Sequence, residues 1–118
     1  MQFVKKQIRP GVVALEINSS IQLGPSVQQI EKFVDEAIRL EEKWVIFDLS
    51  RVTYMDSSGV GTIVRSLGRL KKVGGTLRLA GVKAMVEGVL KLTQVVRIIE
   101  IFPTVADASQ DLPLAPNP

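Results

Sequence analysis

The sequence predicts an α/β domain built on a mixed β-sheet, mostly parallel with an antiparallel amino-terminal edge, and with helices mainly on one face. Strand-like segments alternate with amphipathic helical segments along the chain, an order that is typical of a largely parallel sheet. The apolar run WVIFDL at 44–49 is typical of a central strand covered on both faces. Two short strand-like segments joined by Arg-Pro-Gly at 9–11 predict an opening hairpin.

Apolar periodicity and turn residues place the individual elements. Strands are expected at 3–8, 12–17, 44–49, 76–82 and 96–102. Helices are expected from Pro25 to about Leu40, from MDSSGVG to Gly74-Gly75, at 83–93, and from Pro103 to about Gln110. The periodicity of the third helix predicts a buried side formed by Met85, Val89, Leu90 and Leu92. We expect one domain at 1–110 and a flexible, proline-rich tail at 111–118.

Composition narrows the classes of function. The 118 residues are 46% apolar and include neither cysteine nor histidine. Thiolate metal sites and the usual general base are therefore excluded. The net charge of +3 comes from scattered cations, without the basic patch and stacking aromatics of a nucleic-acid surface. No apolar run reaches the roughly 20 residues that cross a bilayer. We expect a cytoplasmic protein with no membrane insertion, no direct nucleic-acid contact and no cofactor.

The segment TYMDSSGVGTIV at 53–64 follows the expected central strand and opens the second helix. Functional sites of parallel sheets form at this strand-to-helix junction. The simplest interpretation is a helix cap, because the side-chain oxygens of Asp56 or Ser57 can accept from the free amides of the first turn. A cap does not explain Gly59 and Gly61, since glycine weakens a helix interior. These glycines indicate either close packing of the helix or a bare surface for a partner.

Three chemical alternatives for this segment are weaker. A phosphate cradle lacks both the dinucleotide glycine pattern and the Gly-Lys-Ser/Thr of a Walker loop. A serine nucleophile lacks a histidine base and the Gly-x-Ser-x-Gly pattern. A phosphoaspartate site needs clustered acids, and Asp48 has no acidic neighbour in the sequence. We therefore expect no catalytic residue, no metal site and no enzymatic activity in this chain.

A phosphorylatable switch is also compatible with this position. Phosphate adds about −1.5 to −2 charge at pH 7. The helix amides and dipole at Ser57 tolerate that charge within the fold. Residue chemistry permits this interpretation without selecting it.

The segment FDLSRVTYMDSSGVGTIVRSLGRLKKVGGTLRLAGV resembles the core of the STAS domain family, and more narrowly the bacterial anti-sigma-factor antagonists. The stretch KAMVEGVLKLTQVVRIIEIFPTVADA resembles the carboxyl third of that family. The resemblance implies a STAS-like sheet and a phosphorylatable serine at Ser57, with Asp56, Ser58, Gly59 and Gly61 as switch neighbours. It also implies that the unphosphorylated form binds an anti-sigma factor that is a serine kinase, and so releases a sigma factor. The resemblance further implies a metal-dependent serine phosphatase that reverses the modification.

The family implies a partner surface as well. Its loop after the second strand lies beside the phosphorylated serine and usually has a glycine followed by an aspartate. Here Ser19 and Gln22 stand near those places, which makes Gln22 a candidate contact. Arg65 and Arg69 share one face of the second helix, either as a solvated face or as a contact for an acidic partner. The alternative function is an unphosphorylated STAS scaffold or subunit of another complex, for example one related to transport.

Overall fold

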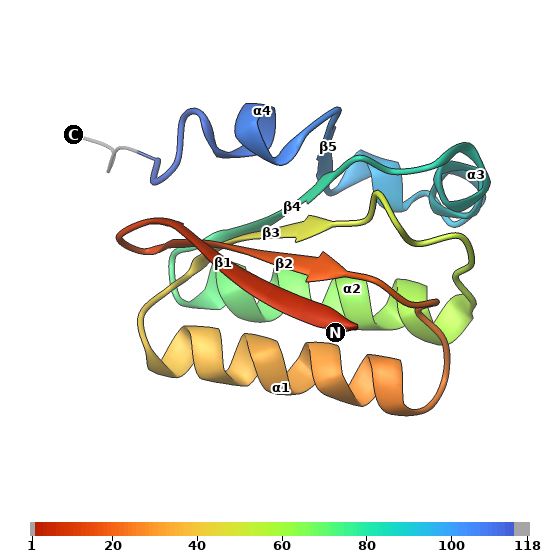
Figure 1. Ribbon diagram of the computed structural model, residues 1–118, viewed down its shortest axis with the longest axis horizontal. Helices are drawn as coiled ribbons and strands as arrows, with labels where there is room; N and C mark the ends of the chain where they lie inside the picture. Colours follow the sequence, from red (N-terminus) through yellow and green to blue (C-terminus); the bar gives the residue numbers. More distant parts are fainter. Residues whose placement is uncertain (1, 115–118) are drawn as a thin grey trace.

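The computed structural model describes residues 2–114 and contains a five-stranded sheet in the order β1-β2-β3-β4-β5 (Figure 1). The strands β1 and β2 pair antiparallel, and the other neighbours are parallel. The predicted mixed sheet with a central third strand is therefore confirmed. The strands are β1 (Phe3–Arg9), β2 (Val12–Ile17), β3 (Trp44–Asp48), β4 (Thr76–Ala80) and β5 (Glu100–Phe102).

Helices cover the two faces of the sheet unequally. They are α1 (Pro25–Arg39), α2 (Ser57–Lys72), α3 (Ala84–Leu92) and α4 (Val105–Ser109), with a 3₁₀ turn η1 (Val95–Arg97). Buried side chains of α1, α2 and α3 join one large apolar cluster, whereas α4 contributes to a smaller cluster on the opposite face. The expectation that helices lie mainly on one face is confirmed. Within residues 2–114, no helix is both long and apolar enough to cross a bilayer.

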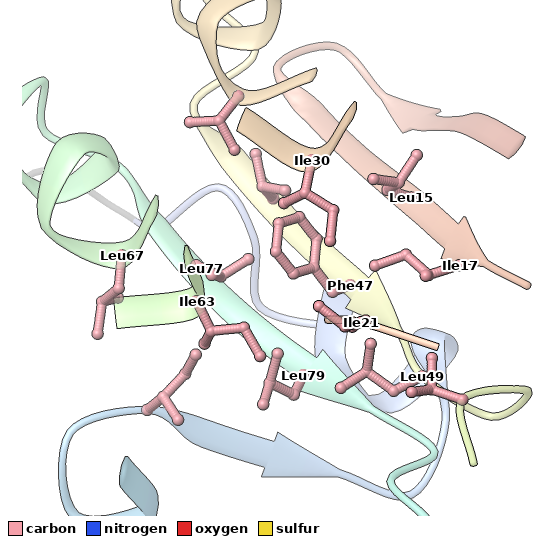
Figure 2. Packing of buried hydrophobic residues seen from close by; sticks show 14 of the residues in the cluster. Leu15, Ile17, Ile21, Ile30, Phe47, Leu49, Ile63, Leu67, Leu77 and Leu79 are labelled. Atoms are coloured by element: carbon pink, nitrogen blue, oxygen red, sulfur yellow. The ribbon is translucent and has the colours of Figure 1, made fainter. Parts of the chain in front are cut away.

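The central strand β3 sends alternate side chains into both clusters, as a strand buried on two faces must. Val45 and Phe47 belong to the large cluster, and Ile46 belongs to the small one, as predicted. Figure 2 shows Phe47 among aliphatic side chains, with Ile30 of α1 beside its ring. The ring also meets Phe33 edge-on, with 6.5 Å between the ring centroids.

The buried side of α3 differs from the prediction. Leu90 is buried and Val89 is half-buried against the large cluster, but Met85 and Leu92 are 63% and 86% exposed. The inward position near the start of the helix is taken by Val86 instead. Apolar residues are spread around this short helix, so periodicity alone could not select the packed face.

The final strand is shorter than the predicted 96–102. Only Glu100–Phe102 pair with β4, and residues 95–97 form the 3₁₀ turn. Gln94 adopts a left-handed backbone with φ of 62°, which turns the chain before the strand. The turn buries Val95 and Ile99 in the large cluster. Packing thus overrides the strand propensity of the Val-Val-Arg-Ile-Ile run.

The carboxyl-terminal segment is anchored where a flexible tail was expected to begin. Leu112 is buried in the small cluster, and Asp111 pairs with the buried guanidinium of Arg78. From the first hairpin, Arg9 Nη1 donates to the carbonyl oxygens of Ser109 and Leu112 at 2.6 and 2.8 Å. Residues 111 and 112 therefore contact the body of the domain, and residues 115–118 of the expected tail lie outside the described residues.

The first prediction concerns the central strand. Phe47→Ala should lower the free energy of unfolding by about 3–5 kcal/mol, because the ring is fully buried and leaves a cavity. Leu92→Ala, at an exposed position, should change it by less than about 0.5 kcal/mol. Chemical denaturation of both variants measures the difference. Equal effects of the two changes would contradict the packing described here.

Candidate functional site

The helix α2 begins with a capped turn formed by residues of the segment MDSSGVG. Asp56 is the N-cap, and its Oδ1 accepts a hydrogen bond from the amide of Gly59 at 2.9 Å. The helix proper begins at Ser57. The cap is therefore Asp56, and the capping function leaves the Ser57 side chain unused.

The same carboxylate also holds the loop that follows β2. Its Oδ2 accepts from the amide of Leu23 at 3.1 Å. The pKa of Asp56 is lowered, mainly by the Leu23 amide and next by the Gly59 amide, because both donors stabilise the charged form. One side chain thus joins the β2–α1 loop to the first turn of α2.

Backbone pairing completes this junction. Ile21 and Met55 form an isolated parallel bridge, in which Ile21 N donates to Tyr54 O at 3.1 Å and Asp56 N donates to Ile21 O at 3.2 Å. A Cβ at Gly59 would collide with the carbonyl oxygen of Ile21 and would lie 2.8 Å from Met55 Cγ. Gly59 is therefore required for the close approach of the loop to α2. This close approach explains Gly59, one of the two glycines for which the helix cap gave no reason.

Ser57 occupies the first position of α2 and is exposed. Among residues 2–114, no group is hydrogen-bonded to its hydroxyl. Ser58 is half-buried, and Gly61 lies one turn further along the helix. A Cβ at Gly61 would approach only the flexible guanidinium of Arg65, at 3.1 Å. Unlike Gly59, Gly61 has no rigid neighbour that explains it.

The cations of α2 already have partners within the chain. Arg65 Nε donates to Glu31 Oε1 of α1 at 3.1 Å. Arg69 pairs with Asp35, which also lies on α1. The side chains remain 57% and 40% exposed, respectively. These pairs join α1 to α2, and such exposed pairs contribute little to stability. The first turn of α2 itself carries no charged residue beyond its cap.

The β2–α1 loop brings Gln22 to the same junction. The backbone N–H of Gln22 donates to Ser26 Oγ at 3.1 Å, while the residue itself is exposed. Beside it, Leu23 is 79% exposed, and Tyr54 on the opposite side of the bridge is 46% exposed. The sequence analysis did not select Leu23 or Tyr54 as site residues. A large apolar side chain in an otherwise polar loop was the signal that could have identified them. Figure 1 shows α1 and α2 beginning at the same end of the molecule, where β2 and β3 finish.

Comparison with known proteins places this sheet and its helices in a family. Residues 3–108 match the STAS domain family, and the chain belongs to that family. It is 30% identical over 102 residues, 86% of this chain and 89% of the relative, to a Thermotoga neapolitana protein named "Putative anti-sigma factor antagonist TM1081 homolog".

Solved structures show the same architecture. The crystal structure of a "putative anti-sigma factor antagonist" from Thermotoga maritima superimposes with a TM-score of 0.84 at 29% identity, covering 93% of each chain. The phosphorylated form of SpoIIAA, a Bacillus cell fate determinant, has a TM-score of 0.73 at 21% identity over 93% of this chain and 98% of its own. The latter likeness establishes the fold alone.

The second prediction separates two glycines of α2. Gly59→Ala should lower the free energy of unfolding by about 1–3 kcal/mol, because its methyl group meets the backbone of Ile21. Gly68→Ala has no neighbour within 4 Å and should raise it by about 0.5–1 kcal/mol. Thermal or chemical unfolding distinguishes the two signs. A stabilised Gly59→Ala variant would show that the loop does not press on α2.

The third prediction follows from the lowered pKa of Asp56. A depressed carboxyl pKa contributes stability that is complete above the unfolded pKa of about 3.9 and is lost as the pH falls through the folded pKa. The excess stability of wild type over Asp56→Asn should therefore be largest near neutral pH and should shrink below about pH 4. Comparing the two proteins cancels the acid sensitivity of other carboxylates. A difference that stays constant across this range would contradict the role of the charge.

Proposed function

We propose that this chain is an anti-sigma-factor antagonist controlled by phosphorylation of Ser57. The unphosphorylated protein binds an anti-sigma factor that is also a serine kinase, and thereby releases a sigma factor. The kinase inactivates the antagonist by phosphorylating Ser57, and a metal-dependent serine phosphatase restores it. The chain acts in the cytoplasm by binding and catalyses no step itself. The observation that carries this proposal is the exposed hydroxyl of Ser57, without a hydrogen-bond partner in residues 2–114, beside a cap that uses Asp56.

The local charges favour a switch that acts on binding more than on folding. A phosphate on Ser57 would stand at the positive end of the α2 dipole, which favours the fold. It would also stand next to Asp56, and the first turn of α2 offers it no cation. The modification therefore leaves an uncompensated negative charge on the surface. Burying that charge against a partner fitted to a neutral serine is costly.

The surface around Ser57 suits a protein partner. Leu23 and Tyr54 expose apolar side chains at the junction, and Gly61 leaves the adjacent turn of α2 without a side chain. We assign these residues to the centre of the contact. The amide side chain of Gln22 adjoins the centre, and Arg65 lies at its rim with Arg69 one turn further away. An acidic partner would compete with Glu31 and Asp35 for these two cations.

The fourth prediction tests the switch with three variants and the cognate kinase. Ser57→Asp should weaken kinase binding by at least about a hundredfold, with a melting temperature close to wild type, because the charge acts at the interface. Ser57→Ala should bind like the unmodified protein and accept no phosphate. Ser58→Ala is the matched control, and it should still be phosphorylated. Calorimetry, thermal melting and mass spectrometry after incubation with ATP give these readouts.

Two results would overturn the proposal. One is phosphate found on Ser58 alone, and the other is a Ser57→Asp variant that binds as tightly as wild type. A chain purified from its native cell without phosphate, under conditions that both activate and silence the sigma factor, would favour the unphosphorylated scaffold instead. In that case Ser57 would be a contact residue and not a switch.

A further inference from the structure

A concave pocket of about 430 Å³ lies on the face of the sheet that carries α4. Near the start of β2 and in the middle of β3 this face is apolar, with Val12, Ala14 and Ile46 packed under Ala108 and Leu112. Towards the carboxyl ends of the same strands, the side chains on this face are Glu16 and Asp48, which line the pocket. Ser50, Gly81 and residues 103–106 contribute to its walls. The proposed antagonist function uses none of these groups.

Two carboxylates lie side by side in this pocket. Glu16 and Asp48 are register partners across the parallel β2–β3 pair. The sequence analysis found no acidic neighbour for Asp48, because the neighbour comes from another strand 32 positions earlier in the chain. Adjacent like charges are unfavourable unless a cation compensates them. The position of available cations therefore decides what the pocket can bind.

Among residues 2–114, cations pair with only one of the two acids. Glu16 forms two ion pairs: its Oε2 lies 3.0 Å from Lys6 Nζ, and its Oε1 lies 3.7 Å from Arg51 Nε. These contacts lower its pKa, with the Lys6 hydrogen bond as the largest cause. Asp48 Oδ1 accepts only from the backbone amide of Ser50 at 3.0 Å, and residues 2–114 provide it with no cation. Asp48 is half-buried and lines the pocket. Its carboxylate therefore lacks a matching positive charge inside this concavity.

The other ligand classes fit this lining poorly. An anion would be repelled by Asp48, since Lys6 is already paired. A bound divalent metal ion needs several oxygen ligands, and the described part of the chain holds no group of three metal-binding side chains. A purely apolar molecule would desolvate the carboxylates without pairing them. What remains is a cation that carries some apolar surface.

We propose that this pocket binds a small organic cation, a primary ammonium group on a short apolar body, with Asp48 as its counter-ion. The ammonium group donates to the Asp48 carboxylate. The body packs on Ala14, Pro103 and Val105, which line the same pocket. The volume lies in the lower part of the usual range for small-ligand sites. This inference is independent of the phosphorylation of Ser57, because it concerns the opposite face of the sheet.

The test is an NMR titration of the full chain with butylammonium chloride, followed by amide chemical shifts. Saturable shifts should centre on residues 14–16, 48–50 and 104–106. Butanol and sodium butyrate are the probes of matched size, and neither should saturate at these amides. Asp48→Asn should weaken butylammonium binding by about tenfold or more, the loss of roughly one charge-assisted contact.

Two further variants keep the test decisive. Asp35→Asn, the same change on α1 at the other face of the sheet, should leave the affinity unchanged. Lys6→Gln should strengthen binding, because Glu16 then loses a competing cation. Thermal melting shows whether each variant is folded. Equal shifts from butanol and butylammonium, or unchanged affinity in both Asp48→Asn and Lys6→Gln, would overturn the proposal.

Discussion

The carboxylate of Asp56 is the contact on which the functional end of the molecule depends. It accepts from Gly59 within α2 and from Leu23 in the β2–α1 loop, so the two segments are fixed relative to each other by one side chain. The bridge between Ile21 and Met55 and the absence of a side chain at Gly59 allow the loop to come this close. The exposed positions of Gln22, Leu23 and Ser57 follow from this junction. The surface is therefore built before any partner arrives, which favours binding without a large ordering cost.

Under the proposed function, the structural and the regulatory role fall on adjacent residues, Asp56 and Ser57. Asp56 orders the turn by accepting hydrogen bonds from the amides of Leu23 and Gly59. Ser57 contributes nothing to the described hydrogen-bond network. A change of charge on Ser57 can therefore alter the surface without removing a contact that the fold needs. If the serine were the cap, its modification would remove the bond that starts α2. This separation of the cap from the exposed hydroxyl is the feature on which the proposed switch depends.

Local chemistry predicted much of this structure. The continuous apolar run identified β3 as the central strand, and the polar residues before the next apolar stripe indicated a helix cap at Asp56 or Ser57. Features set by tertiary contacts were not accessible in this way. The requirement for glycine at position 59 depends on the position of Ile21, and the neighbouring pair Glu16 and Asp48 depends on strand register. Propensity also gave too long a final strand, since it contains no information on the packing of Val95 and Ile99 that forms the turn before β5.

The hydrogen bonds from Arg9 to the carbonyl groups of Ser109 and Leu112 join positions 100 and 103 residues apart. The first hairpin therefore cannot complete its native contacts until residues 109–112 have left the ribosome. Closing a loop of this length costs conformational entropy before the contact forms, and such contacts slow the folding of a domain. During synthesis the apolar side chains of Val12 and Ile46 stay uncovered until the last segment docks. Docking of residues 108–112 is thus the step that protects this face from aggregation.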